Sequence, residues 1–441
     1  MSSASPMRAL LRGAVLTVTA LLVATTGACG GDDRPPPENR QPDVIAPDPP
    51  IRWTVSARDL SSTSVTFQDA DEKSALVTGT KGVPTLIDVA TGARRWTGAP
   101  TAGDASCAFS STRIACAATK WATNSPVITI YDAATGRTTF TAPLSGWHAG
   151  SVQNAGNSWL VETFVRHISK SAYTLFNLDG TIRWTRSGVR GAYVRLASGL
   201  VTFIEESSAG PDGDVHSVVR LSDGRRIAGP GTRLQALPGG FARGGDRVRL
   251  FDAAGTSRGT LPTGWNLTAG TWAGWPQALP QRDCPDLIGE RRKSGRHTDV
   301  GVFDAASGSL RLQRPYTGAR DPKCVEGGVL MLSEARDGYT RVEVFDRLTD
   351  RTRFATEIKF VAGSPSAEAQ SGTVLFLESL RFNRGQADGL TVFGYGIDRD
   401  TGTTLWRTTD DVGTAGGYLF AAGPQRTYVS LIDTRRQRED V

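Results

Sequence analysis

The sequence contains little of what metal-dependent or hydrolytic enzymes use. It has only four histidines, which are scattered along the 441 residues: His148, His167, His216 and His297. No CxxC spacing is present, so a zinc site is not indicated. The GxSxG, HExxH and P-loop patterns are missing as well. Hydrolytic catalysis therefore has no evident general base beside a nucleophile.

Long apolar segments are also scarce, and the one at the start is short. Residues 13–23 are apolar, follow Arg8 and Arg12, and precede Thr26-Gly27-Ala28-Cys29. A transmembrane helix needs about 20 apolar residues, whereas a basic region, a short apolar region and small residues indicate a secretory signal. Residues 1–28 are therefore predicted to be a signal peptide. Because Cys29 follows Gly27-Ala28 as in a bacterial lipobox, we expect lipidation at Cys29; an ordinary signal peptide is the alternative.

Residues 30–50 contain seven prolines and no aromatic residue. Such a segment cannot bury a core, so residues 29–50 are predicted to form a lipidated cysteine and a disordered tether. We expect an exported protein that is lipid-anchored on the extracytoplasmic face of a bacterial membrane.

Four cysteines remain beyond Cys29, an even number that suits an oxidising compartment. Cys107 and Cys116 bracket a ten-residue segment and could face each other across a hairpin. Cys284 and Cys324 would be the second pair. Unpaired buried thiols are the alternative.

A hairpin-like segment recurs along the rest of the chain. In residues 127–140, VITIYDAATGRTTF, an apolar run ends at Asp132, and Gly136 precedes a second strand-like run. An aspartate can accept hydrogen bonds from backbone groups two or three residues on, and glycine permits the positive φ of a bulged hairpin. The copies are centred on Asp88, Asp132, Asn177, Leu221, Asp252, Asp304, Asp346 and Asp398. They lie 31 to 52 residues apart, and repeats of this length made of short strands indicate a β-propeller.

The repeat resembles the PQQ-like (pyrroloquinoline-quinone-type) β-propeller repeat of quinoprotein dehydrogenases and BamB-type lipoproteins. Two copies carry all its marks, and others carry two or three; the matching positions are Asp88, Gly92, Trp96, Asp132, Gly136, Asp304, Gly308, Asp398, Gly402 and Trp406. The resemblance implies an all-β fold, a single β-propeller of four-stranded blades over residues 51–435, with a tail at 436–441. We expect eight blades, within a range of seven to nine, with residues 51–54 pairing with residues 428–433 to close the ring.

A quinoprotein of this fold would be expected to have a tryptophan floor, a disulfide of adjacent cysteines and a Ca²⁺ site. Adjacent cysteines are missing, and four tryptophans are repeat marks. Trp272 and Trp275 could line a site, although packing in a loop is the simpler interpretation. The acidic turn at 211–214 lacks the glutamate of a 12-residue Ca²⁺ loop. No cofactor, PQQ included, no metal and no catalytic residue is predicted.

The net charge of +6 is spread over the blades. In an exported protein this charge favours anionic headgroups or acidic envelope polymers over nucleic acid; a solvated charged surface without a partner is the alternative. Two functions remain open. The first, which the residues favour, is a monomeric envelope lipoprotein whose propeller binds or scaffolds other envelope proteins. The second is a propeller enzyme or quinoprotein-like dehydrogenase that uses the central funnel.

Overall fold

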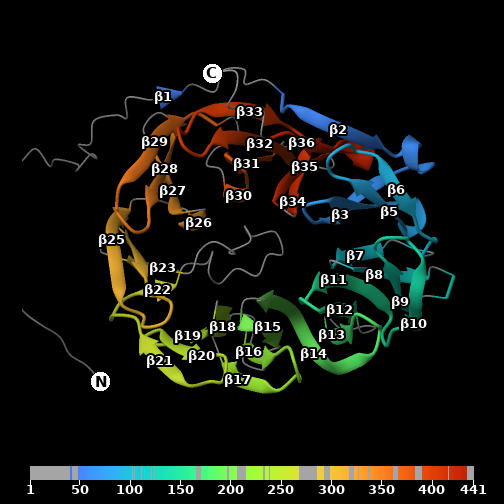
Figure 1. The fold of residues 1–441 in the computed structure, drawn as a ribbon. Helices are drawn as coiled ribbons and strands as arrows, with labels where there is room; N and C mark the ends of the chain where they lie inside the picture. The colour runs from blue at the N-terminus through green and yellow to red at the C-terminus, as the bar shows by residue number, and fades with distance from the viewer. Residues whose placement is uncertain are drawn as a thin grey trace, which may run out of the picture. The chain divides into compact units, whose positions relative to one another are not determined.

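The computed structural model of the chain (Figure 1) divides it into the units Met1–Pro36 and Pro37–Val441. The described residues belong to the second unit and are Arg40–Gln41 and residues 48–434, without residues 102, 104, 111, 121, 124, 165–169, 196–197, 206–214, 232–233, 238, 268–285, 293–297, 317–321, 326, 336–337, 361–365, 383–389 and 416. Cys29, Cys284, Trp272, Trp275, His167, His297 and the turn at 211–214 lie outside the described residues.

The described strands form four-stranded antiparallel units, which we call blades and number in chain order. Blade 1 contains β3 (Val65–Ala70), β4 (Ser74–Gly79), β5 (Val83–Asp88) and β6 (Arg94–Thr97). Blade 2 contains β7 (Ala105–Phe109), β8 (Arg113–Lys120), β9 (Ser125–Asp132) and β10 (Thr138–Pro143). Blade 3 contains β11 (His148–Asn154), β12 (Ser158–Phe164), β13 (Ser171–Asn177) and the first part of β14 (Ile182–Arg195).

Blade 4 contains the second part of β14 with β15 (Leu200–Glu205), β16 (Val215–Arg220) and β17 (Arg226–Gly231). Blade 5 contains β18 (Leu234–Leu237), β19 (Gly240–Arg243), β20 (Arg249–Asp252) and β21 (Ser257–Thr260). Blade 6 contains β22 (Asn266–Leu267), β23 (Leu287–Arg292), β24 (Thr298–Phe303) and β25 (Leu310–Tyr316).

Blades 7 and 8 contain β26 (Lys323–Val325), β27 (Gly328–Glu334), β28 (Thr340–Asp346) and β29 (Thr352–Ile358); and β30 (Ser366–Ser371), β31 (Val374–Phe382), β32 (Leu390–Asp398) and β33 (Thr404–Thr408). Blade 9 contains β34 (Asp411–Ala415), β35 (Tyr418–Ala422), β36 (Tyr428–Ile432) and β2 (Ile51–Ser56). Short 3₁₀ turns are η1 (Arg58–Leu60), η2 (Thr80–Gly82) and η6 (Pro424–Arg426).

The all-β propeller predicted from the repeat is confirmed. Strands β2 and β36 pair antiparallel, with Trp53 opposite Leu431, so the two ends of the repeat region complete one blade, as predicted. The described strands make nine four-stranded units in eight sheets, because β14 is shared by blades 3 and 4. The weak copy around Leu221 therefore forms its own third and fourth strands, β16 and β17, and the number of units lies at the upper end of the predicted range.

Apolar clusters fill the boundaries between consecutive blades. Between blades 1 and 2, for example, Leu76 and Leu86 pack with Ile114 and Tyr131. Similar clusters join each later pair, and the last one returns to the start, where residues of β35 and β36 pack on those of β3 and β4. In Figure 1 the blades accordingly follow one another around a ring. Both faces of a blade are therefore covered, as in β9, where six consecutive residues are buried.

One short strand of the predicted tether lies against the propeller. Strand β1 (Arg40–Gln41) pairs in parallel with the outer strand of blade 7, with Arg40 opposite Glu357 and Gln41 opposite Ile358. Further along, Pro49 is buried beside blade 9. These parts of residues 29–50 are therefore held to the blades. No helix among the described residues is long and apolar enough to cross a membrane.

Candidate functional site

The repeated turn between the third and fourth strands is built on one carboxylate oxygen. Asp132 Oδ1 accepts hydrogen bonds from the Thr135 backbone N–H at 3.0 Å and from its hydroxyl at 2.9 Å. The same two bonds recur at four further aspartates: Asp88, Asp304, Asp346 and Asp398. Glycine at a positive φ, +70° at Gly136, then lets the chain reverse direction. The marked residues thus build the blades.

Sequence reasoning missed the arginine that binds the other carboxylate oxygen. Arg95 donates to Asp88 Oδ2 from both Nε, at 3.2 Å, and Nη2, at 2.5 Å. Arg311 binds Asp304 in the same register, and Arg353 lies 3.6 Å from Asp346. The hydrogen bond from Arg95, with that from the Thr91 hydroxyl, holds the pKa of Asp88 below its ordinary value. The recurring Arg-Trp dipeptides at 52–53, 95–96 and 183–184 were the available signal.

The repeated tryptophan connects one blade to the next. The indole N–H of Trp96 in blade 1 donates to the Ala133 carbonyl of blade 2 at 2.8 Å. Trp53 and Trp184 donate in the same way to Val89 and Leu221, at 2.8 and 2.9 Å. The ring covers the glycine of the neighbouring turn so closely that a Cβ at Gly136 would lie 2.6 Å from Trp96. We call this contact tryptophan docking.

The boundary between blades 6 and 7 uses arginine instead. Asp350 stands in the glycine place at a φ of +60°, and Arg314 of blade 6 donates to both its carboxylate and its carbonyl. The same guanidinium binds Glu343 at 2.8 Å and lies 4.5 Å from the centre of the Phe345 ring. We call this contact arginine docking.

A second carboxylate strengthens the same boundary. Asp286, whose side chain is only 2 % exposed, accepts from Arg311 of blade 6 at 2.8 Å and from Arg347 of blade 7. A buried carboxylate is expensive unless it is paired, and here two guanidinium groups from neighbouring blades pair with it. Ion pairs therefore add to the apolar cluster that fills this boundary.

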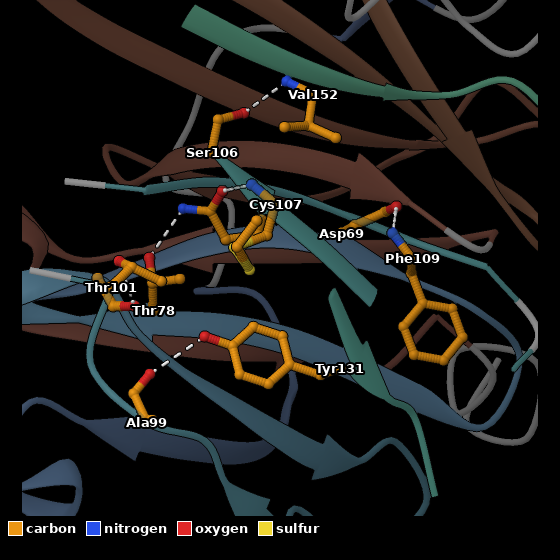
Figure 2. Close-up of a disulfide and its surroundings, with 12 residues drawn as sticks. Asp69, Thr78, Ala99, Thr101, Ser106, Cys107, Phe109, Tyr131 and Val152 are labelled. Carbon is orange, nitrogen blue, oxygen red and sulfur yellow. Dashed lines mark hydrogen bonds between the residues drawn. A yellow bond between two sulfur atoms is a disulfide. The ribbon is translucent and has the colours of Figure 1, made fainter. Parts of the chain in front are cut away.

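The disulfide lies in the second blade, next to hydrogen bonds that connect three blades (Figure 2). Cys107 and Cys116 are bonded and stand directly opposite each other on β7 and β8. On the same strand, the Phe109 N–H donates to Asp69 of blade 1 at 2.8 Å, and the Ser106 hydroxyl accepts from the Val152 N–H of blade 3 at 3.0 Å. Cys324 is also disulfide-bonded, and Cys284 lies outside the described residues.

A cleft of about 400 Å³ lies where the two ends of the repeat region meet, between blades 8 and 9. Its lining is rich in hydroxyl groups and contains two carboxylates: Thr54, Thr408, Thr409, Tyr428, Ser430, Asp48 and Asp410. The Tyr428 hydroxyl donates to Asp410 at 2.8 Å. Burial, with the neighbouring Asp410 carboxylate, raises the pKa of Tyr428 to about 12. The cleft can bind polar groups by hydrogen bonds.

A smaller cleft of about 210 Å³ lies between blades 9 and 1. Its charged lining residues carry both signs: Arg52, Lys73, Arg95, Glu72 and Asp88. Asp88 is already engaged by Arg95 and Thr91, so its carboxylate serves the turn. Like the first cleft, this one offers polar contacts at a blade boundary.

The four repeat tryptophans and the Cys107–Cys116 disulfide do not fit a bound quinone. Trp53, Trp96 and Trp184 are engaged in docking, and Trp406 is fully buried. The disulfide joins opposing strands, where the quinoprotein resemblance implies adjacent cysteines. Among the described ranges, no group of three or more His, Cys, Asp or Glu side chains is placed to hold a metal ion. We derive no chemistry through such a cofactor.

Comparisons with known proteins agree with the repeat. Residues 58–231 match the family described as outer membrane protein assembly factor BamB and carry the PQQ-like repeat. BamB from Moraxella catarrhalis is 13 % identical, with a TM-score of 0.45 over 88 % of this chain and 98 % of that chain. Quinohemoprotein alcohol dehydrogenase from Comamonas testosteroni is 10 % identical, with a TM-score of 0.41 over 89 % and 78 %. No curated protein matches the chain.

Proposed function

We propose that this chain is a membrane-anchored extracytoplasmic lipoprotein whose β-propeller binds or scaffolds other proteins of the cell envelope. The observation that carries the proposal is the match of residues 58–231 to a family described as an outer membrane protein assembly factor. The matched segment includes blades 1 to 4, where tryptophan docking connects blade 1 to blade 2 and blade 3 to blade 4.

The way the blades are joined supports a scaffold role. Backbone N–H groups in the first strand of a blade donate to side chains of the preceding blade, as Phe109 does to Asp69, Val152 to Ser106 and Ala236 to Thr202. These donors would otherwise lack a partner at the edge of a blade. A frame fixed in this way can present its loops and its two polar clefts to a partner with little loss of conformational freedom.

The anchor is supported by the sequence. The predicted signal over residues 1–28 ends at Cys29, and seven prolines follow within residues 30–50. Two acyl chains hold a protein to a membrane stably, whereas one gives only marginal binding. A propeller anchored in this way would remain among envelope proteins.

The test is recovery of partners from membranes that contain the full chain. Cross-linking in cells, affinity capture and mass spectrometry should recover one or more envelope proteins reproducibly. The matched control is Cys29→Ser, which removes the lipid site and leaves the propeller unchanged. We expect the Cys29→Ser control to recover much less of the envelope proteins than the parent chain does. In the parent chain, the mass of the mature N-terminal peptide should show that Cys29 is acylated.

The opposite result would support the alternative function. Recovery of a stoichiometric quinone or divalent metal, with no envelope protein above the control, would overturn the scaffold proposal. An unmodified Cys29 would overturn the anchor.

A further inference from the structure

The turn of blade 7 carries an exposed leucine that the fold does not use. Leu348 lies two residues after Asp346, and its side chain is 68 % exposed. The turn needs only its backbone N–H, which donates to Asp346 Oδ1 at 2.9 Å. The same position in the seven other copies holds alanine or aspartate: Ala90, Ala134, Asp179, Asp223, Ala254, Ala306 and Asp400. A large apolar side chain at this tip therefore needs an explanation outside turn chemistry.

A second exposed leucine and several guanidinium groups accompany Leu348. Leu310, at the start of β25 in blade 6, is 37 % exposed. Arg311 directly follows Leu310, and Arg347 directly precedes Leu348. Both arginines bind the Asp286 carboxylate, so the two leucines flank a shared ion pair. Arg351 is exposed and forms no ion pair with any described residue. We call Leu310, Arg311, Leu348 and Arg351 the leucine–arginine surface.

The length of chain between Cys29 and β1 allows the predicted lipid site to reach this surface. Strand β1 pairs with the end of β29, the strand that directly follows the Leu348 turn. The pairing is parallel, so Arg40 is the end of β1 nearer that turn. Cys29 precedes Arg40 by 11 residues, which span at most about 40 Å when extended. The distance along β29 from Glu357 back to its first residue, Thr352, is roughly 17 Å at the rise per residue of a strand. A lipid at Cys29 can therefore hold the Leu348 turn at the bilayer.

We propose that the leucine–arginine surface docks on the lipid bilayer. The leucines would enter the boundary between headgroups and acyl chains. The Arg351 guanidinium would bind a lipid phosphate, whereas Arg311 stays paired with Asp286 and Asp304. The inference rests on the proposed function in one respect, the lipid at Cys29, and adds an orientation: blades 6 and 7 face the membrane, and the opposite side of the ring is free for partners.

The experiment is photo-cross-linking of the full chain in its own membrane. A photo-reactive phenylalanine analogue replaces Leu348 in one variant and Ile182 in the control. Ile182 is a matched control because its side chain is 62 % exposed but belongs to blade 3. It lies two residues after the turn glycine Gly180, as Leu310 does after Gly308. We expect lipid adducts at position 348 to exceed those at 182 at least tenfold. Equal yields, or no adduct at 348, would overturn the docking surface.

The mass of the N-terminal peptide from the same samples separates the two proposals. Absence of an adduct at 348 with acylated Cys29 overturns the docking surface and leaves the anchor standing. An adduct at 348 with unmodified Cys29 supports the docking surface and overturns the anchor.

A second measurement removes the lipid altogether. The full chain carrying Cys29→Ser is mixed with vesicles that contain phosphatidylglycerol, and binding is measured by flotation. Leu348→Glu should lower the binding constant about tenfold, whereas Ile182→Glu should leave it unchanged. Because both positions are exposed, neither variant should unfold the protein. An equal loss in both variants would overturn the docking surface.

Discussion

Blades 1 to 4 and blades 6 and 7 solve the same packing problem with different chemistry. In the first region an indole ring covers a glycine and donates one hydrogen bond to the next turn between blades 1 and 2 and between blades 3 and 4, and the Phe140 ring covers Gly180 between blades 2 and 3. In the second, Arg314 binds an aspartate in the glycine place, and two arginines share the buried Asp286. The family match ends at residue 231, close to the end of tryptophan docking. A blade boundary thus requires a group that fills the space above the turn and satisfies its polar atoms, and either chemistry provides one.

Removing the shared carboxylate should have the largest effect. Asp286→Asn leaves Arg347, which is 16 % exposed, without its ionic partner. Breaking a buried ion pair in this way costs about 3 kcal/mol or more, so the free energy of unfolding in urea should fall by about that amount. The matched control is Asp223→Asn, whose pair with Arg220 is exposed and contributes about 0.5 kcal/mol or less. Similar losses in both variants would contradict a stabilising role of the buried ion pairs at this boundary.

A side chain at the docked glycine should be the next most damaging. In Gly136→Ala the new Cβ would lie 2.6 Å from the Trp96 ring at a φ of +70°. Together these two costs predict a loss of roughly 2–4 kcal/mol. In the control, Gly156→Ala, φ is +79° but no heavy atom lies within 4 Å, so only the backbone cost of about 1 kcal/mol remains. If urea unfolding gave equal losses, close docking would not stabilise the boundary.

The indole hydrogen bond should make a smaller contribution, which depends little on salt. Trp96→Phe keeps a ring over Gly136 but removes the donor to the Ala133 carbonyl. We expect the free energy of unfolding to fall by about 1 kcal/mol, equally in low and high salt. Trp147→Phe is the control, because that ring is 44 % exposed, and it should be neutral. If the loss of unfolding free energy in Trp96→Phe depended strongly on salt, tryptophan docking would not differ from arginine docking in its dependence on charge.

The smallest effect should be common to both regions, because both use the same turn. The hydrogen bond from the Thr135 hydroxyl lowers the pKa of Asp132, and that from the Thr349 backbone N–H lowers the pKa of Asp346. A lowered pKa in the folded state means that the carboxylate stabilises the fold above its ordinary pKa of 3.8, and that this contribution is lost as pH falls through the folded pKa.

Asp132→Asn and Asp346→Asn should therefore lower the free energy of unfolding at neutral pH. This difference from the parent chain should disappear as pH falls below about 4. The measurement is urea unfolding across this range for both variants. A pH-independent difference would show that the carboxylate charge does not matter to the turn.

The repeat was readable because its chemistry is local. Asp132, Thr135 and Gly136 lie within five positions and form one turn, so spacing alone indicated the hairpins and hence the strands. Arginine docking was not readable, because Arg314 and Asp350 are 36 residues apart and belong to different blades. The same holds for Asp286, which meets Arg347 across 61 residues. The position of Arg40–Gln41 on blade 7 also required the fold, since the composition of residues 30–50 predicted only a tether.

The sequence by itself determined the blades, since each turn and its apolar strands are specified by a few neighbouring residues whose preferences do not depend on the rest of the chain. Tertiary structure alone decided how the blades are joined. It placed the polar cleft where blade 9 is completed by β2, and it placed β1 on β29, the strand that follows the Leu348 turn. Contacts between blades form only when the ring brings distant residues together, and no local pattern records them.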